Sequence, residues 1–412
     1  MTADSAVVII TSQFPFGVGE DFIAGELPAL QAQFDRVLIA PLANKTEQMR
    51  QLPEGVELVE PDRLAASKMR PTVAFSAARQ AVVAARAEAA RSAKIAAFSA
   101  AWVASATRQA RALEASLRRA LTPNTKVVFY GYWLARHAAI AAELKRAWPG
   151  PAVAVSRAHG GDVFEDRAAR GFLPGRRYLA RRLDKVFSIS QAGANTLAQA
   201  GFKPQQVSVA RLGVAATSVR PPASVSEPWC LASCSNAAAV KRLDFLAQVV
   251  AALRERGRAV HWVHIGDSAA GEFDLAREVT RLGIDEDVTL VGPVPNPAVR
   301  AKLADRGAHL FLNVSSSEGV PVTIMEAFSM GLPVLATAVG GTGELVRDGK
   351  EGALISIDHS ADEVARRVED LLTQSPESYR QMRRAALARW EQLAHAGTNY
   401  PDFAAQLARL LH

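Results

Sequence analysis

The chain contains few of the residues that cross-link or anchor a protein. Only two of its 412 residues are cysteines, Cys230 and Cys234, and both fall in one predicted strand. This argues against a disulfide framework and a cysteine-ligated zinc site, and it indicates a reducing, cytoplasmic compartment. No apolar run reaches the ~18 residues of a membrane span. The first residues lack a basic segment, so we expect no signal peptide and no transmembrane helix.

Motifs of several ligand classes are also missing. There is no Gly-x4-Gly-Lys-Ser/Thr loop, which argues against a nucleoside triphosphatase. We find no Asp-x-Asp pair in a loop suited to a metal, and no lysine identifiable as a pyridoxal phosphate anchor. The sequence therefore predicts a protein that requires neither a metal ion nor a bound cofactor.

The positive charge is concentrated in one segment. The chain has 48 Lys and Arg against 41 Asp and Glu, a net charge of +7. Residues 63–122 alone hold eleven basic residues against Glu88 and Glu114, a net charge of +9. Two interpretations stay open. The predicted helices of this segment either pack on the N-terminal domain with a solvated basic face, or dock that face on anionic lipid. No nucleic-acid-binding module accompanies the charge, so we expect no nucleic-acid partner.

The order of short apolar runs and longer amphipathic runs is typical of parallel sheets with crossover helices. Because the chain exceeds the usual size of a single core, we expect two domains. A Pro- and Ser-rich stretch at residues 218–228 reads as the linker. The prediction is an α/β protein with an N-terminal domain at 1–217, a C-terminal domain at 229–394, and a final helix at 395–412 that packs back on the N-terminal domain.

One segment of the C-terminal domain carries a candidate site. Glu318 precedes a predicted helix that contains Glu326, and Pro321 favours the start of that helix. Amides at a helix N-terminus suit a phosphate, and carboxylates suit paired sugar hydroxyls. Glutamates at this spacing alone would fit a core helix with solvated side chains. The neighbouring Gly-Val-Pro and the Gly-Gly-Thr-Gly-Glu run at 340–344 favour a nucleotide-sugar site.

The sequence resembles glycosyltransferase family 4, retaining enzymes of the GT-B fold, in the branch that builds cell-surface polysaccharides. Five segments in order carry the resemblance: residues 11–20 (TSQFPFGVGE), 156–162 (SRAHGGD), 240–244 (VKRLD), 262–267 (WVHIGD) and 318–326 (EGVPVTIME). The resemblance implies two Rossmann-like domains whose parallel sheets face each other across a cleft. It also implies a hexosyltransferase that is retaining and metal-independent. We expect it in the cytoplasm, as the composition indicates, and its location at the inner face of the membrane is one of the two open interpretations of the basic segment.

The resemblance implies a role for each site residue. Glu318 would stabilise the transferred sugar, Glu326 would bind the ribose, and Lys241 would neutralise the departing diphosphate. His159 would contact the sugar or the acceptor, although a lone histidine is more often structural. Further donor contacts would come from Gly17, Gly19, Gly266, Gly319 and Val320. The donor would be a nucleoside-diphosphate sugar, with UDP favoured, and the acceptor a glycan or lipid-linked glycan.

The sequence departs from the family pattern at one position. Members commonly carry an arginine five residues before the lysine, and this chain has Asn236 there. Arg242, next to Lys241, is the candidate to supply part of the missing charge. Two rival functions remain, a nucleotide-sugar epimerase of the same fold and an inactive scaffold that binds nucleotide sugars. Turnover without an acceptor would identify the epimerase.

Overall fold

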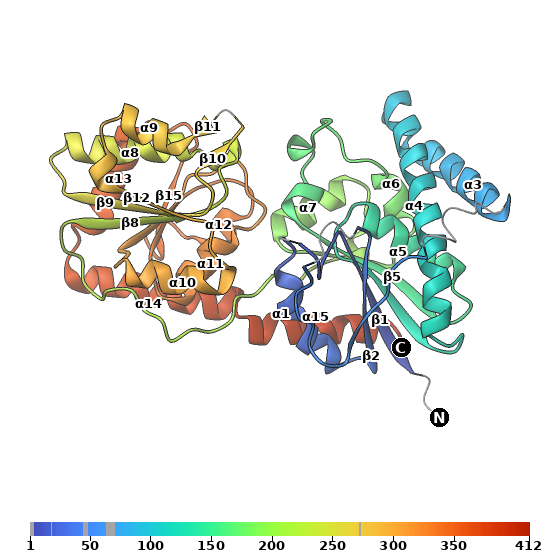
Figure 1. Cartoon of the computed structure of the whole chain (residues 1–412). Helices are drawn as coiled ribbons and strands as arrows, with labels where there is room; N and C mark the ends of the chain where they lie inside the picture. Colours follow the sequence, from blue (N-terminus) through green and yellow to red (C-terminus); the bar gives the residue numbers. More distant parts are fainter. Residues whose placement is uncertain (1–3, 18, 44–47, 63–70, 272) are drawn as a thin grey trace. The chain divides into compact units, whose positions relative to one another are not determined.

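A computed structural model describes residues 4–17, 19–43, 48–62, 71–271 and 273–412. The chain forms two compact units, each built around a parallel sheet (Figure 1). Unit 1 comprises residues 1–212 and 398–412, and unit 2 comprises residues 213–397. Each unit is described on its own.

Unit 1 contains a seven-stranded sheet in the order β3-β2-β1-β4-β5-β6-β7, in which every neighbouring pair is parallel. Its strands are β1 (Ser5–Thr11), β2 (Arg36–Pro41), β3 (Val56–Leu58), β4 (Lys126–Gly131), β5 (Ala152–Ala158), β6 (Lys185–Ser188) and β7 (Val207–Val209). Its helices are α1 (Phe22–Gln31), α3 (Pro71–Glu88), α4 (Ala93–Ala120), α5 (Arg136–Ala147), α6 (Arg176–Ala180), α7 (Gln191–Gln199) and α15 (Ala396–Arg409).

The strands of unit 1 are continuous apolar runs because both faces of the sheet are covered. Along β1, Val8 and Ile10 belong to one buried cluster, whereas Val7 and Ile9 belong to a second cluster on the other face. This alternation is the period-two pattern of a strand. The same clusters include the helices on each side, so the sheet is the middle layer of three.

Helix α15 completes unit 1 although it ends the chain. It lies beside α1 and the sheet in Figure 1, where it is the red helix next to blue and green elements. The ring of Phe403 is 5.5 Å from that of Tyr130 and 5.1 Å from that of Phe187, measured between centroids. The guanidinium of the buried Arg157 stacks 4.1 Å from the same ring. The C-terminal residues are therefore part of the core of unit 1.

Unit 2 contains a six-stranded sheet in the order β12-β9-β8-β13-β14-β15, again parallel throughout. Its strands are β8 (Trp229–Cys234), β9 (Val260–Ile265), β12 (Val288–Gly292), β13 (Leu310–Asn313), β14 (Val334–Thr337) and β15 (Gly352–Ile355), and β10 (Ala269–Ala270) pairs with β11 (Phe273–Asp274) as a separate ladder. Its helices are α8 (Leu243–Glu255), α9 (Leu275–Arg281), α10 (Asn296–Asp305), α11 (Val322–Ser329), α12 (Thr342–Leu345), α13 (Ala361–Leu372) and α14 (Pro376–Leu393).

The stretch 218–228, which the sequence analysis interprets as a linker, belongs to unit 2. The backbone carbonyls of Pro221 and Pro222 accept hydrogen bonds from the guanidinium of Arg383 on α14. The chain passes between the units at 212/213 and again at 397/398. The Pro- and Ser-rich composition of this stretch could not predict its contact with α14, because that helix is distant in the sequence.

The basic segment forms the helix pair α3 and α4 of unit 1, which pack on each other. Val103, Leu113 and Leu117 of α4 are buried in the core. Much of the charge is paired. The carboxylate of Glu114 accepts hydrogen bonds from the guanidinium groups of both Arg111 and Arg118. The Nη1 of Arg119 is 3.2 Å from Oδ2 of Asp62. Arg63, Lys68 and Arg70 lie outside the described residues.

Candidate functional site

In unit 2, Glu318 and Lys241 form an ion pair. The Nζ of Lys241 is 2.7 Å from Oε1 of Glu318, and the glutamate side chain is only 7% exposed. Lys241 ends a short 3-10 turn before α8, whereas Glu318 follows β13. The Nδ2 of Asn313, the last residue of β13, is 3.5 Å from the same carboxylate oxygen. Strand ends of a parallel sheet thus bring together residues 77 positions apart.

The loop that carries Glu318 is packed against a glycine turn. Gly340 has a left-handed φ of 54°, and a Cβ there would lie 1.7 Å from the Glu318 carbonyl oxygen. The amide of Gly341 donates a 2.8 Å hydrogen bond to the carbonyl of Gly319. Ser316 ties the loop to the lysine segment, because its amide donates to the carbonyl of Val240 at 2.8 Å. The paired glycines are therefore required by a close backbone approach.

Glu326 lies on α11 and is 3% exposed. Its Oε1 accepts a 3.0 Å hydrogen bond from Nδ2 of Asn296, the first residue of α10. Burial raises the pKa of Glu326 to about 7, and the hydrogen bond from Asn296 and the charge of Arg300 only partly offset this. Unlike Glu318, this carboxylate has no cation in direct contact among the described residues.

Backbone groups near the two glutamates are positioned for a ligand. Among the described residues, no acceptor pairs with the amides of Gly319 and Val320, which precede the first turn of α11. Gly266 follows β9 with a φ of 125°, and a Cβ there would lie 1.9 Å from the carbonyl oxygen of Ser235. Only glycine fits this turn at the end of the strand.

The Arg242 side chain contacts neither of the two glutamates. It has a left-handed φ of 52°, and its guanidinium stacks 4.2 Å from the ring centroid of Phe245. Its Nη1 donates to the carbonyl of Ile357 at 3.3 Å. Within the described residues, no hydrogen bond or ion pair joins Arg242 to Glu318 or Glu326, and Asn236 is exposed.

In unit 1, His159 follows β5 and is 8% exposed. Its ring lies between two aromatic rings, 5.0 Å from Tyr132 and 4.5 Å from Trp133. Neither ring nitrogen has a hydrogen-bond partner in the described part of the chain. Asp162 fixes the turn, because its carboxylate accepts from the amides of His159 and Leu134. The Nδ1 of His159 lies 3.8 Å from Oδ2 of Asp162, beyond hydrogen-bond distance, so the Nε2 atom is the ring nitrogen most available to a ligand.

Glu20 organises the glycine loop of unit 1. Its carboxylate accepts from the amides of Ser12, Gln13 and Phe14 at 2.8, 3.0 and 2.9 Å, and from Nε1 of Trp133 at 2.7 Å. Burial opposes ionisation, but these hydrogen bonds lower the pKa of Glu20 below its usual value.

Arg50 also contacts the two glycines of this segment. The carbonyls of Gly17 and Gly19 accept from the Arg50 guanidinium at 2.7 and 2.8 Å. Both glycines have positive φ. Arg50 thus holds the backbone of Gly17 and of Gly19 through contacts within unit 1.

Sequence reasoning did not identify Glu20, Asn296 or Asn313 as parts of the site. Glu20 is the last residue of the segment 11–20, but its left-handed φ of 56° is rare for glutamate, so the sequence does not predict that its carboxylate turns back onto the loop. The two asparagines could have been suspected from the sequence. Asn313 ends a strand and Asn296 begins a helix, and ligands bind at such positions in α/β folds.

No group of three or more His, Cys, Asp or Glu is placed to hold a metal ion within residues that the structure describes. The same described part of the chain has no helix long and apolar enough to cross a membrane. The expected independence from metal remains a prediction.

Comparisons with known proteins bear on this geometry. Residues 228–374 match the family model described as "Glycosyl transferases group 1". The chain is 29% identical over 203 residues to the colanic acid biosynthesis glycosyltransferase WcaL of Escherichia coli (strain K12), a name given to that protein provisionally. This match covers 48% of the chain, which spans about half (50%) of that relative's length. A D-inositol 3-phosphate glycosyltransferase of Mycobacterium sp. (strain KMS) is 34% identical over 149 residues, 36% of this chain and 32% of the relative.

Solved structures resemble the whole chain. HepE of Anabaena, crystallised with UDP, superimposes with a TM-score of 0.70 at 18% identity, covering 98% of this chain and 100% of HepE. The lipopolysaccharide outer core galactosyltransferase WaaB has a TM-score of 0.65 at 15% identity, covering 98% and 99%. The predicted resemblance to glycosyltransferases and the predicted fold of two parallel-sheet α/β domains, as in GT-B enzymes, are confirmed.

Proposed function

We propose that the chain transfers a hexosyl unit from a nucleoside-diphosphate sugar to a glycan or lipid-linked glycan, with retention of anomeric configuration and without a metal. The observation that carries this proposal is the Lys241–Glu318 ion pair in the same unit as the buried Glu326. A single fold unit thus supplies a cation for phosphate and two acids for sugar hydroxyls. UDP is the favoured nucleotide, because HepE was crystallised with UDP and with UDP-glucose.

Each side chain has a distinct task in this proposal. Lys241 leaves Glu318 and neutralises the diphosphate as the sugar–phosphate bond breaks. Glu318, once free of the lysine, accepts hydroxyls of the sugar and stabilises its developing positive charge. Stabilisation of a developing charge by fixed groups is usually the largest catalytic contribution. The free amides of Gly319 and Val320 add donors for phosphate oxygens.

Glu326 and the remaining site residues of both units bind rather than react. Ionised Glu326 accepts the paired hydroxyls of the ribose in place of the amide of Asn296. His159 contacts the sugar or the acceptor through a ring nitrogen that is otherwise unpaired. Gly17, Gly19 and Gly266 let backbone approach the donor closely.

The test is the stereochemistry and acceptor dependence of the product. Incubation with a UDP-hexose and a glycan acceptor, followed by NMR of the new anomeric proton, should give the configuration of the donor. A product of inverted configuration would contradict the mechanism. Conversion of the donor sugar to an epimer without any acceptor would identify an epimerase instead.

We further propose that helix α3 docks on the anionic inner face of a membrane. Phe75 is 73% exposed and Val82 is 51% exposed. Arg79 and Arg86 are also exposed, and the four residues recur at helical spacing on one face. Two apolar anchors that alternate with two cations along the helix suit a bilayer with anionic headgroups, where each cation is worth about 1 kcal/mol.

Liposome co-sedimentation tests this docking. The variant Phe75→Ser/Val82→Ser should lose binding to anionic vesicles, and high salt should weaken the wild type. Replacing Arg108, Arg111, Arg118 and Arg119 with Gln should have the smaller effect, because three of these arginines are already in ion pairs. Equal recovery on neutral and anionic vesicles would reject the docking.

A further inference from the structure

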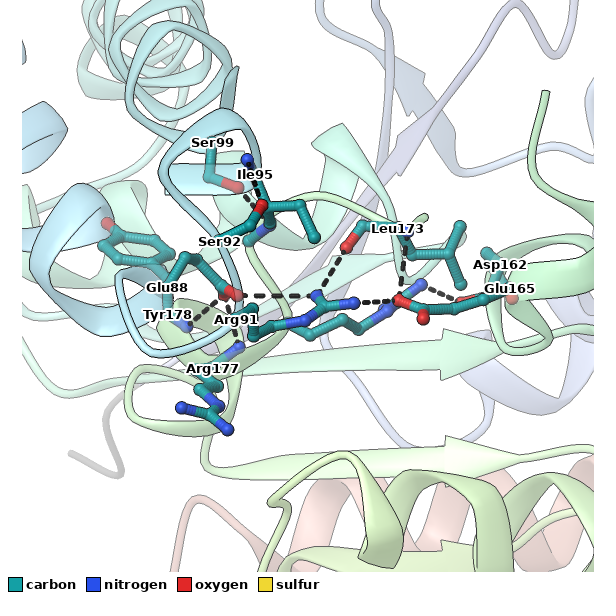
Figure 2. Close-up of polar contacts among 12 residues, drawn as sticks. Glu88, Arg91, Ser92, Ile95, Ser99, Asp162, Glu165, Leu173, Arg177 and Tyr178 are labelled. Atoms are coloured by element: carbon teal, nitrogen blue, oxygen red, sulfur yellow. Dashed lines mark hydrogen bonds and ion pairs between the residues drawn. The ribbon is translucent and has the colours of Figure 1, made fainter. Parts of the chain in front are cut away.

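Buried polar networks occur in both units. In unit 1, one of them joins the turn between α3 and α4 to the start of α6 (Figure 2). Its Arg91 contacts the carboxylates of Glu88 and Glu165 and donates to the carbonyl of Leu173. The carboxylate of Glu88 also accepts from the amide of Arg177. The charges of Glu88 and Arg91 are thus paired within the fold, which makes this network structural.

A second network lies in unit 2 and joins β8 to β9. The Nε1 of the buried Trp262 donates to Oγ of Ser233 at 3.0 Å. The same oxygen is 2.9 Å from Nδ1 of His264, and Nε2 of His264 is 3.1 Å from the carbonyl oxygen of Asp267. Ser233 and His264 are direct neighbours in the pairing of the two strands. His264 is fully buried, and both of its ring nitrogens have partners.

These contacts determine which nitrogen of His264 carries the hydrogen. A carbonyl oxygen can only accept, so Nε2 is protonated and donates to Asp267. Burial lowers the pKa of His264, which favours the neutral ring. In a neutral ring Nδ1 is then an acceptor, and the hydroxyl of Ser233 donates to it. The hydrogen bonds therefore run in one direction, from Trp262 through Ser233 and His264 to the carbonyl of Asp267.

The network ends at the turn of residues 266–268, which follows β9. In the sheet, β9 lies between β12 and β8, so this turn lies between the segment that leads to Asn296 and the end of β8. The amide of Gly266 donates to the carbonyl of Gly292, just after β12, at 3.0 Å. Because the carboxyl ends of parallel strands meet at one edge of a sheet, the turn shares that edge with the loop of Glu318.

The turn keeps free polar groups. Among the described residues, no acceptor pairs with the amides of Asp267 and Ser268. Within the same residues, no hydrogen bond or ion pair holds the exposed carboxylate of Asp267. The carbonyls of the turn are engaged, because that of Asp267 accepts from His264 and that of Ser268 accepts from the amide of Leu275 at 2.8 Å. The backbone of the turn is thus held through its carbonyls, and its amides stay open to a ligand.

We propose that His264 is a positioning residue for the donor, which holds the turn of residues 266–268 so that its two free amides can donate to the nucleoside-diphosphate sugar. This deepens the proposed function and rests on it, because Gly266 begins the turn and is one of the proposed donor contacts. His264 acts through the backbone of Asp267 and does not itself touch the donor.

Nitrogen NMR of the full chain tests the direction of the hydrogen bonds, because protonated and unprotonated imidazole nitrogens have different chemical shifts. The histidine nitrogens are labelled and measured at pH 8, and the signals of His264 are those missing from the spectrum of His264→Gln. We expect a hydrogen on Nε2 and none on Nδ1. A hydrogen on Nδ1 alone would overturn the proposal, because His264 could not then donate to Asp267.

Calorimetry with UDP-glucose tests the effect on the donor. His264→Leu should weaken binding about three- to tenfold, the scale of one hydrogen bond, whereas His264→Gln should bind within about twofold of wild type, because its amide can donate to the same carbonyl. His261→Leu is the matched control. His261 lies on the same strand, three residues away and hence on the other face, with Nε2 2.8 Å from Oγ1 of Thr289. This variant should bind the donor like wild type.

Trp262→Phe separates stability from positioning. It removes the donor to Ser233 but leaves His264 in contact with Asp267, so the thermal unfolding midpoint should fall while the affinity for UDP-glucose stays that of wild type. An equal loss of affinity in Trp262→Phe and His264→Leu, or no loss in His264→Leu, would overturn the proposal and leave a structural network. Absence of UDP-glucose binding in the wild type would instead reject the proposed function and the donor as ligand of the turn, whereas the NMR result tests the hold of His264 on the turn by itself.

Discussion

At the scale of residues, the two glutamates of unit 2 differ in their partners. Glu318 contacts a lysine at 2.7 Å, whereas Glu326 contacts only a neutral amide. In the proposed function, Lys241 must leave Glu318 when a donor binds, whereas Glu326 is a buried hydrogen-bond acceptor that pairs with no cation of the described residues. The sequence predicted both residues, but it could not predict their partners, because Asn296 and Lys241 are 30 and 77 positions away.

Replacing each glutamate should therefore give a different defect. Glu326→Ala should weaken nucleotide binding about tenfold or more, since buried hydrogen bonds to hydroxyls are lost. Glu318→Ala should leave nucleotide affinity within a few-fold and reduce kcat. Calorimetry with UDP and steady-state kinetics would separate the two effects. Wild-type kcat/KM in both variants would contradict the assignment.

The raised pKa of Glu326 predicts a pH dependence of donor binding. With a pKa of about 7, the carboxyl is mostly neutral at pH 6 and ionised at pH 8. Ionised oxygens accept ribose hydroxyls more strongly, so the affinity for UDP-glucose should rise between these pH values. UDP-glucose is the suitable probe, because its diphosphate has no group that titrates there. The Glu326→Gln variant should show a flat profile; a parallel rise in it would assign the effect to another group.

The same shift affects stability in the opposite direction. Burial raises the pKa of Glu326 from 4.5 to about 7, so the folded state keeps a proton that the unfolded chain releases. The free energy of unfolding should then fall as the pH rises from 4.5 to about 7. Urea unfolding at pH 5 and pH 8 should show a larger decrease for wild type than for Glu326→Gln. An equal decrease in both proteins would argue against a raised pKa at this site.

At the scale of elements, the alternation of apolar and amphipathic runs predicted most strands and crossover helices. The predicted helix at residues 323–329 appears as α11, which begins one residue earlier. The amphipathic pattern of residues 273–282 predicts a helix over that whole range, and the structure contradicts its start. Asp274 caps α9 by accepting from the amides of Ala276 and Arg277, so the helix begins at Leu275. A capping side chain outweighed helical periodicity there.

The turn at Gly340 supports the Glu318 loop and gives a prediction for an element. Gly340→Ala should destabilise unit 2 by more than about 1 kcal/mol, because alanine disfavours a left-handed φ and its Cβ would overlap the Glu318 carbonyl. It should also reduce kcat/KM by displacing that loop. Thermal unfolding and kinetics would measure both effects.

Gly343 on α12 is the matched control for this substitution. A Cβ at Gly343 would meet nothing within 4 Å, so Gly343→Ala should be neutral or slightly stabilising. Equal effects of the two substitutions would show that close packing at Gly340 is unimportant.

At the scale of the whole molecule, the order of residues and the division into units do not coincide. Residues 398–412 are separated from the rest of unit 1 by all of unit 2. The sequence predicts a final helix at 395–412 that packs on the N-terminal domain, and Tyr400, Phe403 and Leu407 of α15 are buried in unit 1. Sequence alone could not give the crossing points, because no composition change marks Leu212 or Gly397.

This discontinuity predicts how fragments behave. A fragment of residues 1–212 should fold poorly, because it leaves the faces of Tyr130 and Phe187 without Phe403. The same fragment joined through a flexible linker to residues 398–412 should unfold cooperatively. In the full chain, Phe403→Ala should cost about 3–5 kcal/mol. Circular dichroism during thermal unfolding would compare the fragment, the linked form and the full chain; a 1–212 fragment that unfolds cooperatively and is equally stable would contradict the account.

The central claim is that unit 2 binds a nucleoside-diphosphate sugar through Lys241, Glu318 and Glu326. Isothermal titration of the full chain with UDP-glucose, compared with GDP-glucose and dTDP-glucose, tests it most directly. The account predicts saturable binding without added metal, tightest for UDP-glucose and at least about tenfold weaker in Glu326→Ala. Absence of binding by every donor, or unchanged affinity in Glu326→Ala, would contradict it.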